Sequence, residues 1–161
     1  MFKIILLLFV TTFVSAKSFN FTELRYRDAI ERSIELQGEI SFLEDGLNIY
    51  YPKKLKNLEY KNGVLIYSEN SKEIELNDIQ SAQITRYFDI LILLHNGDES
   101  SLEEMFEVSH DFGGTMLKPK GSIKNYIDSI ELFKEKKALK YVKLFLKNSD
   151  YITITIHDET D

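Results

Sequence analysis

Residues able to do acid–base or metal chemistry are few in this chain and widely spaced. The three histidines are His95, His110 and His157, and there is no cysteine. His110 precedes Asp111, but catalytic triads are assembled in space, so adjacency in sequence carries little information. No histidine spacing matches a helical zinc motif, and thiolate chemistry is excluded. The sequence therefore predicts no catalytic residue, no metal site and no cofactor. We interpret the three histidines as exposed residues or residues of edge strands.

Paired carboxylates are a second candidate for chemistry. They occur at Asp98–Glu99, Glu103–Glu104 and Asp158–Glu159. Acid–base catalysis needs one carboxyl of a pair to be desolvated, whereas these pairs lie beside predicted turns or near residue 161. We interpret them as solvated charge. The sequence predicts a protein that is not an enzyme, with a site invisible in sequence as the alternative.

The first residues have the pattern of a secretory signal. Lys3 is followed by an apolar run from Ile4 to Val14, and Val14-Ser15-Ala16 offers small residues for cleavage. An uncleaved membrane anchor is the alternative, but nothing after Ala16 prolongs the apolar run to membrane-spanning length. We therefore expect a signal peptide at residues 1–16, a single domain at residues 17–161, and a periplasmic location.

The charge balance excludes some partners. Without residues 1–16 the chain has 19 Lys and Arg against 26 Asp and Glu, a net charge of −7. A negative protein is a poor partner for nucleic acid or for an anionic membrane surface. Only Lys134–Lys147 is locally basic. This stretch either docks an acidic partner or protects an exposed strand from pairing with another chain.

Two amphipathic helices are predicted. In the first, over residues 20–38, Asn20 and Glu23 have the spacing of a capping box and Gly38 is a natural stop. Its apolar side would carry Tyr26, Ala29, Ile30 and Ile34. The second covers residues 78–95, where Ile84, Tyr87, Phe88, Leu91 and Leu94 recur at helical spacing.

Most of the remaining chain alternates with the period of two that is typical of strands. Asp45-Gly46 and Asn62-Gly63 are strong hairpin signals. The predicted strands are residues 39–44, 47–51, 57–61, 64–67, 73–76, 105–109, 115–118, 126–134, 138–147 and 151–158. The pattern predicts one antiparallel sheet of nine or ten strands, large enough to curl.

Several predicted strands have bulky apolar residues on both faces. In the stretch ISFLEDGLNIYY one face carries Ile40, Phe42, Leu47, Ile49 and Tyr51, while Leu43 and Tyr50 point the other way. Either helices cover one face and tyrosines lie half exposed on the other, or a curled sheet keeps a concave apolar pocket that the helices only partly fill. In the second reading the helix residues Phe88 and Leu91 and the adaptable Met105 and Met116 also line the hydrophobic cargo cavity.

A series of short motifs runs along the chain: G-x-I-x-F at Gly38–Phe42, L-N-I at Leu47–Ile49, Pro52, the Asn62–Gly63 turn before L-I-Y, L-K-P-K at Leu117–Lys120, I-D-S-I-E-L at Ile127–Leu132, and the closing N-S-D-Y-I-T-I-T-I. In the order of these motifs the chain resembles the family of periplasmic outer-membrane lipoprotein carriers (LolA-like proteins), as a divergent member. The chain departs from the family at Glu44-Asp45, where typical members place a basic residue, and in lacking tryptophan.

The resemblance implies an α+β, mainly β fold: a curved antiparallel sheet forming an unclosed half-barrel with helices packed on its concave face. It also implies a monomeric, non-enzymatic carrier that shields the acyl chains of lipoproteins or related lipids. Such a carrier takes its cargo from an inner-membrane transporter and delivers it to an outer-membrane receptor. The alternative is the same fold used as a protein-interaction or exporter-accessory module without lipid cargo.

Overall fold

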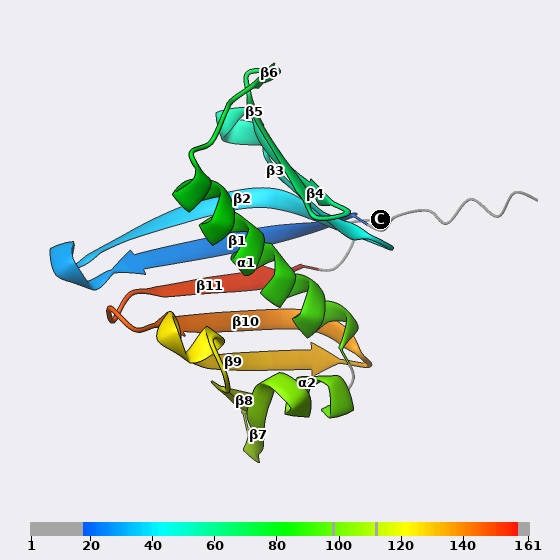
Figure 1. The fold of residues 1–161 in the computed structure, drawn as a ribbon, viewed down its shortest axis with the longest axis vertical. Helices are drawn as coiled ribbons and strands as arrows, with labels where there is room; N and C mark the ends of the chain where they lie inside the picture. The colour runs from blue at the N-terminus through cyan, green and yellow to red at the C-terminus, as the bar shows by residue number, and fades with distance from the viewer. Residues whose placement is uncertain (1–17, 98, 112, 158–161) are drawn as a thin grey trace, which may run out of the picture.

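The computed structural model describes residues 18–97, 99–111 and 113–157. The predicted signal peptide at residues 1–16 lies outside this range. The described chain forms one open antiparallel sheet of eleven strands with two α-helices (Figure 1). The predicted fold class, α+β and mainly β, is therefore confirmed.

The elements follow one another along the chain with short connections. The first half contains β1 (Ser18–Arg27), β2 (Arg32–Leu43), β3 (Gly46–Tyr51), β4 (Lys56–Lys61), β5 (Val64–Glu69), β6 (Lys72–Glu73) and α1 (Asp78–Asn96). The second half contains α2 (Glu99–Met105), β7 (Phe106–Asp111), β8 (Gly114–Pro119), β9 (Ile127–Glu135), β10 (Ala138–Leu146) and β11 (Tyr151–Ile156). Three 3₁₀ turns are η1 (Asp28–Ile30), η2 (Pro52–Lys54) and η3 (Ile123–Asn125).

The sheet order brings the first and last strands together at its centre. The order is β6-β5-β4-β3-β2-β1-β11-β10-β9-β8-β7, so the pairing of β1 with β11 joins two runs of neighbouring hairpins. Strands β6 and β7 form the two edges. Helix α1, which connects the two edges, crosses one face of the sheet and contacts both β3 and β10 (Figure 1).

Both predicted hairpin turns are present, but one is shifted by a residue. Asn62 and Gly63 form a two-residue loop with φ of 50° and 79°, as a type I′ turn requires. In the other hairpin Leu43 pairs with Gly46, so the loop is Glu44-Asp45 and Gly46 belongs to β3. A Cβ on Gly46 would collide with the carbonyl oxygen of Tyr60 on β4, which explains why glycine is needed there.

The predicted helix over residues 20–38 is wrong, because this segment forms the β1–β2 hairpin. Period-two alternation was present in β2 as Ile34, Leu36, Gly38, Ile40 and Phe42. It was hidden in β1 because two of the positions facing α1 carry charged residues, Glu23 and Arg25, whose partners come from the tertiary structure. Tertiary context thus overrides the helical spacing.

Gly38 does not end a helix but lies inside β2, opposite Phe21 of β1. A Cβ at Gly38 would lie 2.5 Å from the carbonyl oxygen of Tyr50 and 2.8 Å from the Phe21 ring. Phe21, which is 1% exposed, packs over the glycine and also meets the Tyr51 ring edge-on at 5.7 Å. The glycine therefore gives a large aromatic side chain room against the backbone.

Helix α1 confirms the second predicted helix. Asn77 caps it in a reciprocal capping box with Gln80, which satisfies backbone N–H groups that the helix leaves free. Its buried residues are Phe88, Ile90, Leu91 and Leu94. The short helix α2, with Leu102 buried, was not predicted. No helix among the described residues is long and apolar enough to span a membrane.

The face of the sheet away from α1 also carries aromatic side chains. Tyr26 and Tyr151 stack at 4.9 Å, and Phe145 lies 6.3 Å from Tyr151. The ammonium group of Lys143 lies over both Phe145 and Tyr151. Part of the second apolar face is thus covered by a cation–aromatic cluster instead of by a helix.

Candidate functional site

The first cavity, which we call the α1 cavity, lies between α1 and the strands at the centre of the sheet. It has a volume of about 590 Å³.

The interior of the α1 cavity is mostly apolar. Its wall is formed by α1 on one side and by β10, β11 and the start of β9 on the other. The apolar lining residues are Ile84, Tyr87, Ile90, Tyr126, Ile127, Leu144, Leu146 and Ile152. A concave apolar space of this size is typical of sites that bind small ligands.

Three cationic side chains also line the α1 cavity: Arg25, Arg86 and Lys147. The guanidinium group of Arg86 lies 4.6 Å from the centre of the Tyr126 ring, which links α1 to the segment before β9. Lys147 donates to Asp128 at 2.6 Å on the surface. The cavity therefore combines an apolar wall with positive charge.

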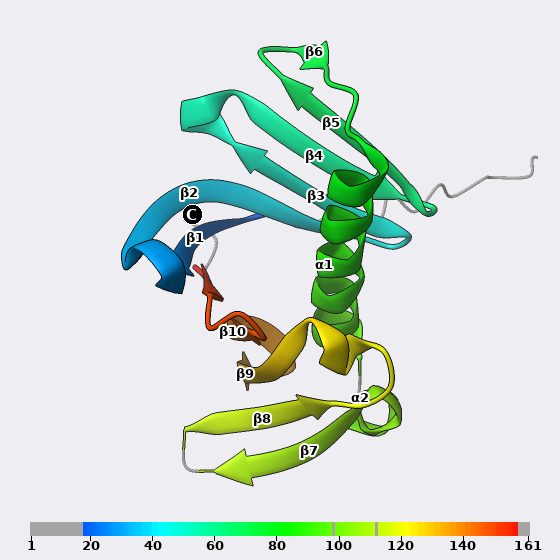
Figure 2. The same cartoon turned by 60° about the vertical axis from the view of Figure 1, so that its left-hand side comes forward.

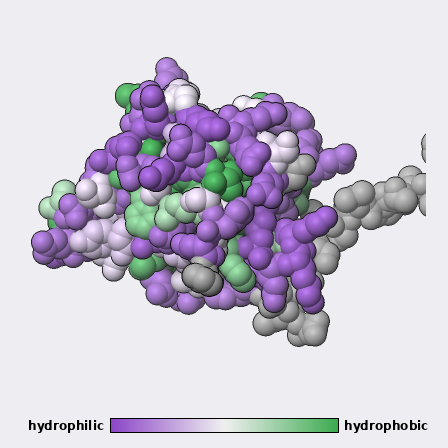
Figure 3. Space-filling model, turned by 90° about the horizontal axis from the view of Figure 1, so that it is seen from below, coloured by the Kyte–Doolittle hydropathy of each residue, from purple (hydrophilic) through white to green (hydrophobic). Residues whose placement is uncertain are grey.

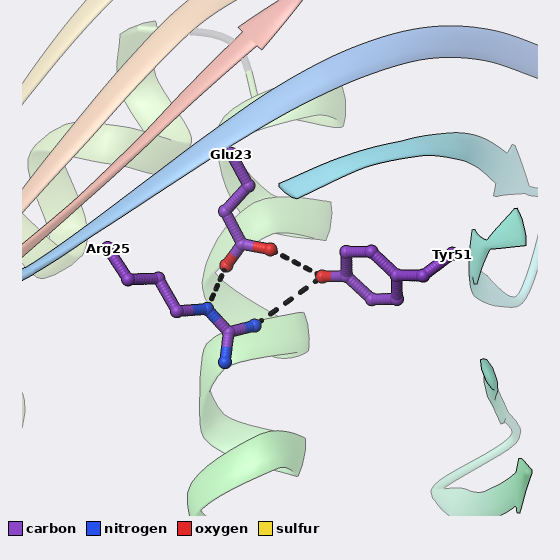
Figure 4. A network of polar contacts seen from close by, with 3 residues as sticks. All are labelled: Glu23, Arg25 and Tyr51. Atoms are coloured by element: carbon purple, nitrogen blue, oxygen red, sulfur yellow. Dashed lines mark hydrogen bonds and ion pairs between the residues drawn. The ribbon is translucent and has the colours of Figure 1, made fainter. Parts of the chain in front are cut away.

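A buried polar cluster holds Arg25 in place (Figure 4). The carboxylate of Glu23, which is 0% exposed, accepts from Arg25 Nε at 2.6 Å and from the Tyr51 hydroxyl at 2.5 Å. Arg25 Nη2 donates to the Tyr51 hydroxyl at 3.4 Å. A buried carboxylate is tolerated only when it is paired and hydrogen-bonded in this way.

The environment of the cluster shifts the pKa of Arg25 and of two tyrosines away from the physiological range. Burial lowers the pKa of Arg25, but the carboxylate of Glu23 outweighs this effect and the pKa is raised. Burial, followed by the charge of Glu23, raises the pKa of Tyr51. The same two causes raise the pKa of the buried Tyr87 hydroxyl on α1. Arg25 is therefore charged and both phenols are neutral.

The second cavity, which we call the α2 cavity, has a volume of about 750 Å³ and lies at the other end of α1. Leu102, Val108 and Leu132 contribute apolar surface. Its polar lining residues are His95, Asn96, Glu99, His110, Asp111, Thr115, Lys134 and Lys137. Lys134 also donates to the carbonyl oxygen of Gly97 at 2.9 Å, which fixes the end of α1 to β9. Figure 3, seen from the β7 end, shows apolar patches between hydrophilic side chains.

His110 is the side chain in the α2 cavity with the most evident acid–base potential. It contacts Glu99 through Nε2 at 2.9 Å and Thr115 through Nδ1 at 3.1 Å. The side chains of His110 and Glu99 are 59% and 66% exposed. Such exposure gives none of the desolvation that tunes a catalytic pair.

Of the other histidines, His95 also lines the α2 cavity, whereas His157 does not. His157 contacts Thr22 at 2.9 Å, and the His95 ring stacks on Phe42 with centroids 3.6 Å apart. Among the described residues, no group of three His, Asp or Glu side chains could hold a metal ion. Asp98, Asp158 and Glu159 of the paired carboxylates lie outside the described residues.

Most of the predicted cavity residues come together as packed core. Ile40, Leu47, Ile49, Tyr51, Phe88 and Leu91 are each at most 3% exposed and belong to one hydrophobic cluster. None of them lines the α1 or the α2 cavity. Their contact with cargo stays a prediction.

The other three predicted cavity residues lie apart. Phe42 is partly buried against the core and stacks on His95. Met105 is 39% exposed at the end of α2. Met116 precedes the core residue Leu117 in β8, and successive side chains of a strand alternate, so Met116 lies on the opposite face of the sheet. The structure does not bring these two methionines to the early hairpin.

Sequence reasoning missed the residues of the α1 cavity, apart from helix positions assigned to the core. Its three cations come from β1, α1 and the turn after β10. No spacing along the chain relates positions so far apart. The one available signal was the unusual alternation of Glu23 and Arg25 with apolar residues in β1.

A scan of protein-family models and a search of curated proteins both find no match for this chain.

Proposed function

We propose that this protein is a periplasmic, non-enzymatic carrier that shields acyl chains of lipoproteins or related lipids, as a divergent LolA-like protein. The observation that carries the proposal is the α1 cavity, whose apolar wall includes Ile84, Leu144 and Ile152. The apolar run before Ala16, with the pattern of a signal peptide, supports export.

The energetics favour a carrier with such a cavity. Transferring an acyl chain from water to an apolar site gains about 0.8 kcal/mol per CH₂. A chain crossing an aqueous compartment therefore needs shelter, and a volume of about 590 Å³ lies within the range of about 300–1,000 Å³ for ligand sites. The contact of α1 with both β3 and β10 makes this helix the cover of the sheet face.

We propose further that the sheet curves into an unclosed half-barrel around α1. An open sheet of eleven strands supports this idea, because sheets of that size tend to curl. In Figure 2, β4 and β5 lie towards one end of α1, and β7 and β8 lie towards the other. As the resemblance to LolA-like proteins implies, the carrier is a monomer. It receives its cargo from an inner-membrane transporter and delivers it to an outer-membrane receptor.

The proposal is tested by filling the α1 cavity. Ile84→Trp places a large ring in the cavity, whereas Ile79→Trp changes the same helix at a residue that is 72% exposed. Both variants and the parent protein are purified after export and analysed by native mass spectrometry. We expect acyl adducts on the parent and on Ile79→Trp, and their loss from Ile84→Trp with unchanged circular dichroism. A parent protein that carries no acyl species and binds none when offered would refute the proposal.

A second candidate function is a protein-interaction module without lipid cargo. Strand β7 favours it, because this six-residue edge strand pairs with β8 and with no other strand of the described residues. An unpaired strand edge can accept a strand from a partner. Capture of a protein partner by a carrier that stays free of lipid would support this alternative.

A further inference from the structure

The charge of the α1 cavity is opposite to that of the whole protein. The chain has a net charge of −6, with 26 acidic residues against 20 basic ones. The lining of the α1 cavity nevertheless includes Arg25, Arg86 and Lys147, and no Asp or Glu of the described residues contributes to it. A negative protein that gathers only cations around an apolar space favours a ligand that has both an apolar and an anionic part.

The three cations differ in whether they already form an ion pair with a carboxylate. Arg25 is paired with the buried Glu23, and Lys147 is paired with Asp128. Arg86 faces the ring of Tyr126, and no carboxylate of a described residue forms an ion pair with it. The two pairs are close to neutral, so Arg86 leaves the site with about one positive charge for a ligand to neutralise.

We propose that the ligand of the α1 cavity is a single-chain amphiphile with an anionic headgroup. Its hydrocarbon chain packs against Ile84, Leu144 and Ile152, and its headgroup binds Arg86. This inference rests on the proposed carrier function and specifies the chemical class of the cargo. Guanidinium groups suit carboxylate and phosphate alike, because their N–H donors match both in bidentate geometry.

The test compares ligands with one chain and different headgroups. Dodecanoate, dodecyl phosphate, dodecyl maltoside and dodecyltrimethylammonium are titrated into the full chain by calorimetry, below their critical micelle concentrations. We expect both anions to bind at least tenfold more tightly than the maltoside, and the cation to bind most weakly. Higher salt should reduce this preference. Comparing the affinities of dodecanoate and dodecyl phosphate shows whether the cavity prefers a carboxylate or a phosphate headgroup.

Two arginine variants test whether Arg86 causes the preference for anionic headgroups. Arg86→Gln should weaken anion binding about tenfold and leave maltoside binding within about twofold, which corresponds to the loss of one charge-assisted contact. Arg32→Gln, on the exposed start of β2, makes the same change outside the cavity and should alter neither.

The two proposals fail in different ways. If no dodecyl compound binds, the carrier function itself is refuted. If all four bind equally and Ile84→Trp abolishes binding, the carrier function stands and the anionic headgroup is refuted. An equal loss of every ligand in Arg86→Gln would also overturn the inference, because Arg86 would then act only through the structure.

Discussion

Replacing Tyr51 with Phe tests the buried polar cluster that positions Arg25. The hydroxyl of Tyr51 donates to the Glu23 carboxylate at 2.5 Å, and that carboxylate is 0% exposed. The variant removes this donor and keeps the ring, including its edge-on contact with Phe21 at 5.7 Å. Glu23 keeps Arg25 as a partner but loses a hydrogen bond that solvent cannot replace.

The expected loss follows from the charge and burial of the acceptor. A hydrogen bond to a charged group contributes about 1.5–3 kcal/mol to stability, so we expect the free energy of unfolding to fall by about 2 kcal/mol. With a urea m-value of about 2 kcal/mol/M for a domain of this size, the midpoint falls by about 1 M.

The assay is urea unfolding followed by circular dichroism and tyrosine fluorescence. Tyr50→Phe is the matched control, because the neighbouring Tyr50 lies on the other face of β3 and its hydroxyl makes no hydrogen bond to a described residue. Its stability should change by no more than about 0.5 kcal/mol. Equal midpoints for the two variants, with equal m-values, would show that the cluster does not stabilise the fold.

Two further predictions concern packing and pH. Gly38→Ala should destabilise the protein by about 1–3 kcal/mol in urea unfolding, because the added Cβ meets a backbone oxygen at 2.5 Å; Gly113→Ala, whose nearest contact is 3.5 Å, is the control and should be nearly neutral. Burial, and then Lys134, lowers the pKa of His95 below 6.5. The unfolded state therefore binds more protons between the folded pKa and 6.5, and stability should fall as pH decreases through that window. An NMR titration giving His95 a pKa above 6.5 would contradict this assignment.

The sequence was informative where the signal was local. The Asn62-Gly63 pair correctly predicted a hairpin turn, and the apolar spacing of residues 78–95 correctly predicted helix α1. Prediction failed in β1 because Glu23 and Arg25 interrupt its apolar alternation, and their partner Tyr51 lies 28 and 26 residues further along the chain. A helical reading of this segment satisfied local spacing but not the tertiary partners.

The candidate site was less predictable than the fold. Alternation correctly placed Ile40, Leu47 and Ile49 on one face, but it could not distinguish a packed interior from the wall of a cavity. That distinction depends on where α1 crosses the sheet. The cations Arg25 and Arg86 line one cavity because the β1–β11 pairing places β1 in the centre of the sheet, which α1 crosses.

The most direct test of the central claim is to locate a bound acyl chain by NMR. Isoleucine methyl groups are labelled, and intermolecular NOEs to protonated dodecanoate are measured in the otherwise deuterated protein. The α1 cavity predicts NOEs to Ile84, Ile127 and Ile152. NOEs confined to Ile40 and Ile49, or no intermolecular NOEs at saturating ligand, would contradict it.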